Sequence, residues 1–371
     1  MENTTENKPK KSFLNYINVF RGLAILLIIM GHVMQFGEPG SLAHIINCEI
    51  TCGGTALFIF ISGFLFHHLS GKFEYKNYLS KKWTNVILPY FITAIPGLFF
   101  CFYCPDLYKN PFDGLNHFLQ VPILLSIGRV HNVPTWFIPM IVLFFISSWL
   151  LLKLEKKGIL YKLLPFMFLI TLLFPRGEME YGAIMNLSYF DKYLSYANYV
   201  ITGYIHFFSL YVFGMFCSSR KEIIDKFYEK RFLLFILMIA AAALNVYTSY
   251  KGIYASYTLS KTFLIMLLLG YLKHYDEFIL SHSKTNKTLD FIAKYSFGLF
   301  FIHWYWLFIY DQLLNLPEVV PIDASNYMTV FGIVIIRFIA VTGLSVLTLF
   351  VSKLIIKKIN KDANTRMFLG I

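Results

Sequence analysis

The chain has few charged side chains, and its acidic residues are outnumbered by basic ones. Of its 371 residues, 15% are charged, whereas an ordinary soluble domain carries about 25%. Hydrophobic residues make up 57% of the chain, and the mean hydropathy is +0.58. This composition excludes an ordinary soluble domain and indicates an integral membrane protein.

Several motifs of soluble enzymes are also absent. The sequence has no glycine-rich phosphate loop, no G-x-S-x-G nucleophile elbow and no H-E-x-x-H zinc motif. Its five cysteines lack the histidine partners of a typical metal site, so we expect free thiols and no bound metal. Four of them fall at predicted external helix ends, where a disulfide is the alternative. No small-residue cleavage motif follows the first apolar run, so we expect no cleavable signal peptide.

Long apolar runs fill most of the chain. They predict an all-α, polytopic membrane protein with about ten transmembrane helices in one bundle, since each run approaches the 17–25 residues that a span needs. We divide the chain into a polar segment (1–12), a transmembrane domain (13–353) and a short tail (354–371). The predicted spans begin near Asn15, Gly53, Val86, Pro134, Ile159, Tyr199, Phe232, Leu259, Phe291 and Tyr327.

The loops differ strongly in basic residues. Alternate segments hold most of the lysines and arginines, including the pairs Lys81–Lys82 and Lys357–Lys358, whereas the other loops hold only five. Cytoplasmic loops are the lysine- and arginine-rich ones, so we predict that this set and both termini are cytoplasmic. The net charge of +12 needs no nucleic-acid partner, because the charge is scattered over six short segments.

Arg21 and His32 are the first candidate site residues. Both lie in the first apolar run. Burying an ionisable side chain in such a run costs free energy, so its presence there indicates a functional site. Eleven residues make about three helical turns, so both side chains share one face, roughly 16 Å apart along the axis. Snorkelling of Arg21 and an interhelical hydrogen bond of His32 are the structural alternatives. The pair on one face favours function.

Other candidates have strong structural alternatives. Ser62 follows small residues that permit close helix packing, and it is also placed to orient a catalytic group. Lys81 and Lys82 are typical of an inner-surface anchor, yet they also suit phosphate binding. Trp136 fits an interfacial belt. His303 lies near mid-membrane and is a possible supporting residue.

Two more buried ionisable residues, His206 and Arg337, can be structural. The longest predicted external loops, 105–133 and 176–198, are rich in aromatic, Asn and acidic residues. Their aromatic content favours an interfacial belt, and their polar content also suits a carbohydrate-binding rim.

The motifs resemble those of the acyltransferase-3 family of membrane O-acyltransferases. The R-x10-H pattern is Arg21 to His32, and the F-F-x-x-S-G-F element is 58–64. Trp136 and its following Phe resemble the W-F element, and 296–303 resembles S-x-G-x-Y-x-x-H. Many members carry arginines before the third span, where this chain has lysines.

This resemblance implies transfer of an acyl group, usually acetyl, from cytoplasmic acyl-CoA to a hydroxyl of an envelope polysaccharide. It implies a multi-pass protein of the bacterial cell membrane, surrounded by lipid, with acetyl-CoA as donor substrate and no permanently bound cofactor. His32 is then the general base or a transient acyl carrier, and Arg21, Lys81 and Lys82 hold the donor. Polysaccharide O-acetylation is the expected activity.

A transporter of a glycan or small solute is the main alternative. Buried arginine and histidine also mark proton relays and substrate paths in transporters. Many transporters have paired helices broken by Gly or Pro in two related halves, and no such pairing is visible in this sequence.

Overall fold

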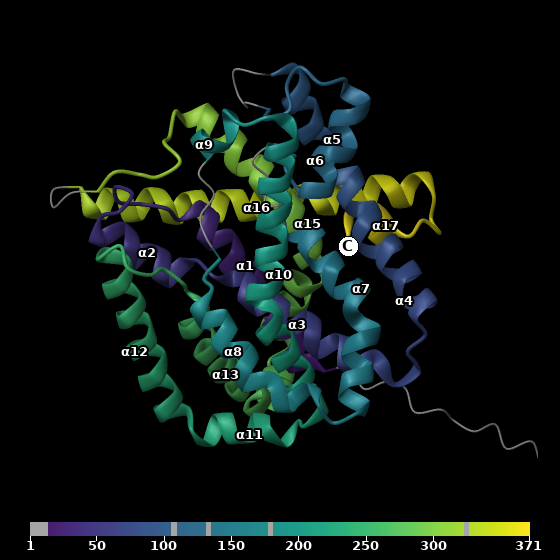
Figure 1. Ribbon diagram of the computed structural model, residues 1–371, viewed down its shortest axis with the longest axis vertical. Coiled ribbons are helices and arrows are strands. Elements are labelled where there is room, and N and C mark those ends of the chain that lie inside the picture. The colour runs from purple at the N-terminus through teal and green to yellow at the C-terminus, as the bar shows by residue number, and fades with distance from the viewer. Residues whose placement is uncertain (1–13, 105–109, 131–134, 177–180, 323–325) are drawn as a thin grey trace, which may run out of the picture.

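The protein is all-helical. Apart from a single bridge between Phe36 and Val320, the described residues form only helices, turns and loops, gathered into one body (Figure 1). The predicted segment 1–12 and Pro134, where the fourth span was predicted to begin, lie outside the described residues. The computed structural model describes residues 14–104, 110–130, 135–176, 181–322 and 326–371.

The first three helices form one side of the site. Helix α1 (Asn15–Val33) is continuous through both candidate residues of the first span. A short helix, α2 (Leu42–Thr51), follows, and Ser41 caps it by accepting a hydrogen bond from the His44 backbone. Helix α3 (Gly54–Leu69) then begins after Gly53, whose φ of 88° is a conformation that favours glycine.

The third span is interrupted by a wider turn. Helix α4 (Tyr75–Lys82) passes into a π-helical segment, η2 (Trp83–Ile87), which leads into α5 (Leu88–Tyr103). Pro89 lacks an amide hydrogen and its ring crowds the carbonyl four residues back, so the helix widens ahead of it. Such π segments are frequent at functional sites, and Lys82 directly precedes this one.

The remaining elements follow in chain order. They are α6 (His117–Ile127), α7 (Phe137–Lys156), η3 (Leu160–Leu163), α8 (Leu164–Leu173), α9 (Tyr181–Met185), α10 (Tyr189–Ser219), α11 (Glu222–Glu229), α12 (Arg231–Tyr250), α13 (Thr258–His274), α14 (Asp276–Ser281), α15 (Ser283–Leu314), α16 (Tyr327–Ile359) and α17 (Thr365–Leu369), with η1 (Ser70–Lys72) between α3 and α4.

Helices α3 and α10 approach each other closely at two glycines. A methyl group on Gly63 would overlap the carbonyl oxygen of Tyr211, and one on Gly214 would overlap that of Phe60. The rings of Phe60 and Phe213 lie 5.4 Å apart beside this crossing. The small residue at Gly63 therefore allows close helix packing, as its sequence pattern predicts.

Within the described residues, seven helical segments are long and apolar enough to cross a membrane. The all-helical, polytopic class is therefore confirmed, and the chain is a multi-pass membrane protein. Three of the ten predicted spans fall outside this set. The predicted span from Ile159 forms the short helices η3 and α8, α13 has 17 residues, and α15 is long but more polar.

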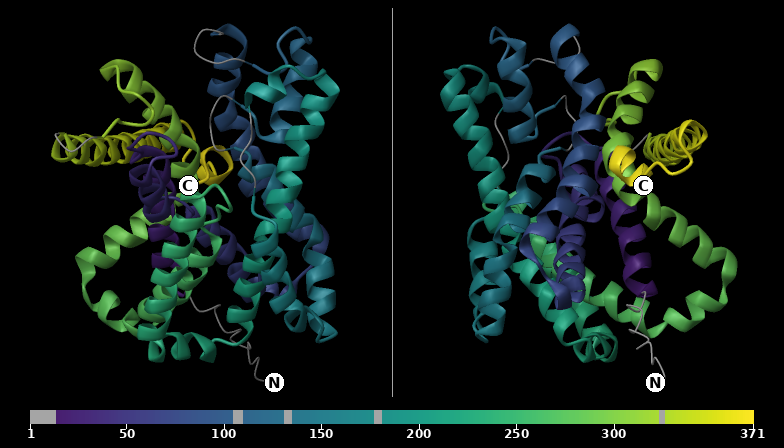
Figure 2. Two further views of the ribbon diagram at one scale, coloured as in Figure 1. Left: turned by 60° about the vertical axis from the view of Figure 1, so that its left-hand side comes forward. Right: turned by 90° about the vertical axis from the view of Figure 1, so that its right-hand side faces the viewer.

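Helix α16 is the most apolar of the seven, yet it runs across α7 and α10 rather than along them (Figures 1 and 2). It packs against α15 and α1. Arg337, fully buried at its middle, forms an ion pair with Asp311 of α15 and donates a hydrogen bond to the Glu318 carbonyl. This contact ties α16 to the end of α15, which gives Arg337 a structural role.

The segment 354–371, predicted as a short tail, is largely helical and folds back onto the other helices. Helix α16 continues to Ile359, and α17 then packs back against α5, η2 and α16. Leu369 and Ile371 of this segment lie against Gly298 in the middle of α15. The predicted tail is thus part of the packed body.

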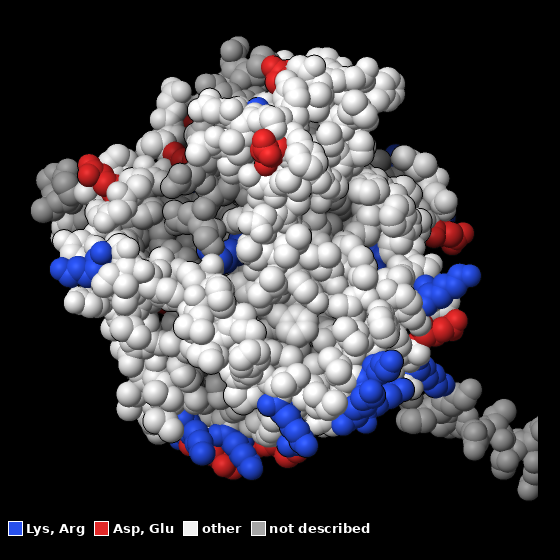
Figure 3. Space-filling model, in the orientation of Figure 1, with Lys and Arg blue, Asp and Glu red and all other residues white. Residues whose placement is uncertain are grey.

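Basic side chains gather at one end of the molecule. In Figure 3 many of the visible lysines and arginines lie along the lower edge and the lower right, and Figure 1 has α11 at the lower edge. We call Lys221, Lys226 and Lys230, which lie on α11 and its flanks, the basic end. Helix α10 runs from Asp191 at the opposite end to Ser219 beside α11.

We predict that the basic end faces the cytoplasm. In a cysteine-free background, a cysteine at Lys226 should react with a membrane-impermeant thiol reagent only after the cells are opened. Cysteines at Asp113 and Asp191 should react in intact cells. All three positions are exposed, so lack of access to the side chain cannot explain a negative result. Labelling of the Lys226 position in intact cells would reverse the orientation.

Candidate active site

Helix α1 carries both a cation and an imidazole on one continuous stripe. Because α1 is unbroken from Asn15 to Val33, Arg21 and His32 share a face and lie about 16 Å apart along the axis. Their surroundings differ. His32 lines a cavity and Arg21 does not.

His32 contacts two aromatic residues of α15. Its ring lies 5.5 Å from that of His303 and 5.1 Å, edge to face, from that of Trp304. His303 is fully buried, and its Nδ1 donates a hydrogen bond to the Leu299 carbonyl at 2.8 Å. A carbonyl can only accept, so Nδ1 carries the hydrogen and Nε2 keeps a lone pair. That buried Nε2 has no hydrogen-bond partner among the described residues.

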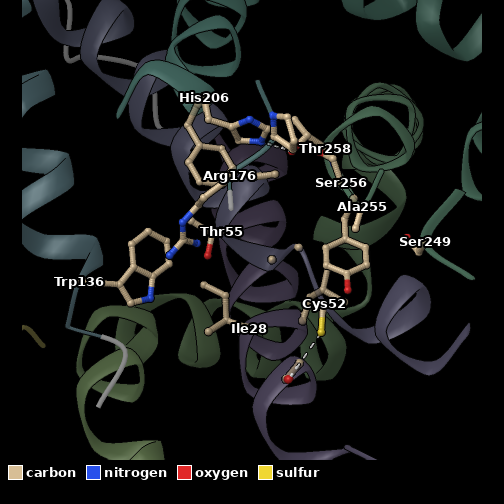
Figure 4. A pocket seen from close by; sticks show the side chains of 18 of the residues that line it. Ile28, Cys52, Thr55, Trp136, Arg176, His206, Ser249, Ala255, Ser256 and Thr258 are labelled. Carbon is tan, nitrogen blue, oxygen red and sulfur yellow. Dashed lines mark hydrogen bonds between the residues drawn. The ribbon is translucent and has the colours of Figure 1, made fainter. Parts of the chain in front are cut away.

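The cavity beside His32 has a volume of about 780 Å³, within the usual range for small-molecule sites. Figure 4 shows side chains that converge on it from α1, the start of α3, α10, the segment that follows α8 and the segment that precedes α13. Trp136, Tyr199, Tyr254 and Tyr257 supply aromatic surface, and none of the described lining residues is acidic. The remaining polar lining includes Cys52, Thr55, Arg176, His206, Ser249, Ser256 and Thr258.

One guanidinium group lies in this cavity. Arg176 stacks over the Trp136 ring, with its central carbon 3.4 Å from the ring centre, and lies 4.3 Å from the centre of the Tyr199 ring. It also donates a hydrogen bond to the Tyr199 hydroxyl. A stacked guanidinium on aromatic faces is rigid, so it offers a fixed positive charge to whatever enters.

His206 lines the same cavity, but its ring is fully engaged. Nδ1 donates to the Phe174 carbonyl at 3.0 Å, so Nε2 accepts from the Thr258 hydroxyl at 2.6 Å. These bonds join α10 to α13 and to the end of α8. His206 therefore acts as a structural residue of the cavity wall.

A buried polar cluster supports the wall formed by Gly53. Glu49 accepts hydrogen bonds from Asn245 at 2.6 Å and Ser260 at 2.5 Å, and it pairs with Lys261 at 3.8 Å. Lys261 also donates to the Glu49 carbonyl, and its side chain lies directly against Gly53. The cluster thus fixes α2 against α12 and α13 next to the cavity.

Arg21 lies in a polar chain between α1 and α15. Its Nη2 donates to Asn18 at 2.9 Å, and Asn18 donates to Asp290 at 2.9 Å. Asp290 also pairs with Lys294 at 2.6 Å. The Arg21 Nε is buried and has no partner among the described residues, so the guanidinium keeps one unused donor.

Lys82 is half-buried, and its ammonium lies over the rings of Tyr78 and Phe145, at 5.3 and 4.6 Å from their centres. Within the described ranges it forms no ion pair. Lys82 also has a charged neighbour that the sequence did not predict. Arg366 of α17 lies close enough to both Lys82 and Arg21 for the charges to repel.

Two candidates stand apart from these groups. Lys81 is exposed. Ser62 donates to the Phe58 carbonyl of its own helix at 2.8 Å, and it does not line the cavity. The structure therefore places His32 and Trp136 at the cavity, with the buried His303 beside His32. Arg21 and Lys82 each have Arg366 of α17 as a charged neighbour.

Arg176, which lines the cavity, and Arg366, which lies near Arg21 and Lys82, are candidate residues that sequence reasoning missed. Arg176 was detectable only as one of five basic residues in the predicted external loops. Arg366 had no signal, because it lies beyond the last apolar run, where a basic residue is ordinary.

The architecture and site define a polytopic, all-helical membrane protein with titratable residues concentrated around its first helix. A family model described as an acyltransferase domain, Acyl_transf_3, matches residues 14–356. The chain belongs to this acyltransferase 3 family and is an acyltransferase. No curated protein and no solved structure matches it.

The Glu49 cluster generates a stability prediction. Glu49→Ala leaves the buried Lys261 charge without its carboxylate, which typically costs about 3–5 kcal/mol. We expect a lower thermal unfolding midpoint for the purified protein. The double variant Glu49→Gln, Lys261→Met removes both charges and should recover most of the loss. A single variant as stable as the wild type would show that the pair does not hold α2.

Proposed function

We propose that this acyltransferase moves an acyl group, which we take to be acetyl, from cytoplasmic acyl-CoA to a hydroxyl of an envelope or extracellular polysaccharide. We further propose that it works in the bacterial cell membrane. One observation carries the proposal. The single helix α1 carries both the Arg21 guanidinium, whose buried Nε has no partner among the described residues, and an imidazole, His32, that borders a cavity.

The side chains of Arg21 and Lys82 suit the donor. Acyl-CoA carries several phosphates and a thin arm that ends in the thioester, and guanidinium and ammonium groups bind phosphate well. Arg21 has an unused buried donor, and Lys82 has no ion-pair partner among the described residues. These two side chains would hold the phosphates, and the exposed Lys81 would add positive charge beside them.

His32 is the proposed catalytic residue. As a general base it would take the proton of the acceptor hydroxyl while the hydroxyl oxygen attacks the thioester carbonyl, and the proton would then pass to the departing CoA thiolate. As an acyl carrier, a ring nitrogen of His32 would attack the thioester carbonyl and the C–S bond would break to release CoA thiolate. The acceptor hydroxyl would then attack the acyl-imidazole, lose its proton and free the histidine. The neighbouring His303 lone pair supports either role, because it can accept a proton from an adjacent imidazole.

The cavity suits a carbohydrate acceptor. Sugar rings have apolar faces that stack on aromatic residues and hydroxyls that need polar partners, and the lining supplies both. Trp136 would be a stacking surface that Arg176 holds in place. The arginine further favours an acceptor that carries negative charge.

Replacement of His32 is the direct test of the mechanism. We expect His32→Ala, at normal membrane abundance, to lower acylation by about 10²–10⁴-fold, the usual cost of losing a general base. The measurement is mass spectrometry of surface glycans from cells with the wild type, with the variant and without the protein. His303→Ala should be measured in parallel.

His282→Ala is the matched control, because His282 is exposed and outside the cavity. It should leave acylation unchanged. Near-normal acylation in His32→Ala would reject the mechanism. If wild-type and protein-free cells carried the same acyl groups but differed in the amount of exported glycan, the protein would be a transporter instead.

A second test concerns the donor. Arg21→Lys keeps the charge but replaces a planar fork with a point charge. Loss of a charged hydrogen bond costs about 1.5–3 kcal/mol, so we expect acyl-CoA binding to weaken roughly tenfold or more. Isothermal titration of the purified protein with acetyl-CoA measures this. Unchanged affinity in both Arg21→Lys and Arg21→Ala would reduce Arg21 to a structural anchor.

A further inference from the structure

We propose that Arg366, on the short helix α17, is a third phosphate-binding residue of the donor site and acts together with Arg21 and Lys82. This inference rests on the proposed function, since it assumes that acyl-CoA is the donor. It assigns a binding role to a segment beyond the matched family region, which ends at residue 356.

Arg366 has two positive neighbours, which come from two other parts of the chain. Arg21 comes from α1 and Lys82 from the end of α4. Helix α17, which carries Arg366, packs against η2 directly after Lys82 and against α15, the helix that Gly22 beside Arg21 also contacts. In this position Arg366 is close enough to repel both cations. None of the three forms an ion pair within the described ranges. Asp290 acts on Arg21 electrostatically, but it is already engaged by Asn18 and Lys294.

Gathering like charges is unfavourable, so other contacts must hold Arg366 there. Asn364 caps α17 by accepting a hydrogen bond from the Arg366 backbone at 3.1 Å. At the other end of the helix, Gly370 has a φ of 73° and packs directly against the Phe297 ring. The Leu369 backbone lies against Gly298, where any side chain would collide with it. Figure 1 shows α17 beside α5.

The exposure of the three residues also fits a site for a large anion. Arg366 is exposed, whereas Arg21 and Lys82 are half-buried, and Arg21 keeps its Nε donor unused. An entering ligand would therefore meet an accessible guanidinium first and two less hydrated cations behind it. A multiply charged anion relieves the repulsion among the three, and CoA supplies three phosphates on one molecule. Inorganic ions would relieve it less, because they carry fewer charges.

The test compares CoA with pantetheine, the part of its arm that lacks phosphates. The purified full chain should bind CoA much more tightly than pantetheine, and Arg366→Ala should weaken CoA binding roughly tenfold while pantetheine binding stays unchanged. Arg366→Lys should fall between the wild type and Arg366→Ala, and Arg366→Glu should be weakest. A structural role would not produce this order. Thermal unfolding midpoints should match, because Arg366 is exposed.

Lys361→Ala is the matched control. It removes one positive charge from an exposed residue of the same segment and should leave CoA affinity as in the wild type. Equal CoA affinity for the wild type and Arg366→Ala would overturn this inference and leave the proposed function standing. A wild type that does not distinguish CoA from pantetheine would overturn the donor site as a whole.

Discussion

The cost of burying ionisable groups among apolar helices constrains the whole structure. A buried charge or polar group needs a partner, because neither lipid nor packed side chains can replace water. Arg337 with Asp311, Glu49 with Lys261, and His206 with Thr258 meet this need and in doing so join helices that are distant in sequence.

A small number of buried polar atoms remain unpaired in the described part of the chain, and these include Arg21 Nε and His303 Nε2. Both atoms belong to the pair of packed helices α1 and α15. Such atoms are uncommon in folded proteins and each needs an explanation, which the proposed donor-binding and catalytic roles supply for these two. His206 is structural because both of its ring nitrogens are bonded. Arg337 also has an unpaired Nε, but its guanidinium is held by Asp311 and by the Glu318 carbonyl, and the sequence alone left both residues open.

The packing of α1 also explains how one helix can carry both the proposed donor-binding residue Arg21 and the proposed catalytic residue His32. Helix α1 packs most extensively against α15 and also packs against α3. Contact with α15 at Gly22 is close, since a methyl group there would lie 3.3 Å from the Leu289 carbonyl oxygen. This packing keeps the Arg21 and His32 stripe in contact with α15, so the histidine pair and the Asn18–Asp290 link occur on one interface.

The sequence by itself determined the class of protein, most of the apolar helices and the shared face of Arg21 and His32. These features depend on composition, run length and helical period, which are local. Only the tertiary structure decided that His303 rather than Ser62 lies beside His32, that Lys82 is half-buried against aromatic rings whereas Lys81 is exposed, and that α16 runs across α7 and α10. It also decided that α17 brings Arg366 back to the site. The physical reason is that such contacts join residues tens to hundreds of positions apart, and their geometry follows from helix packing, about which the local pattern carries no information.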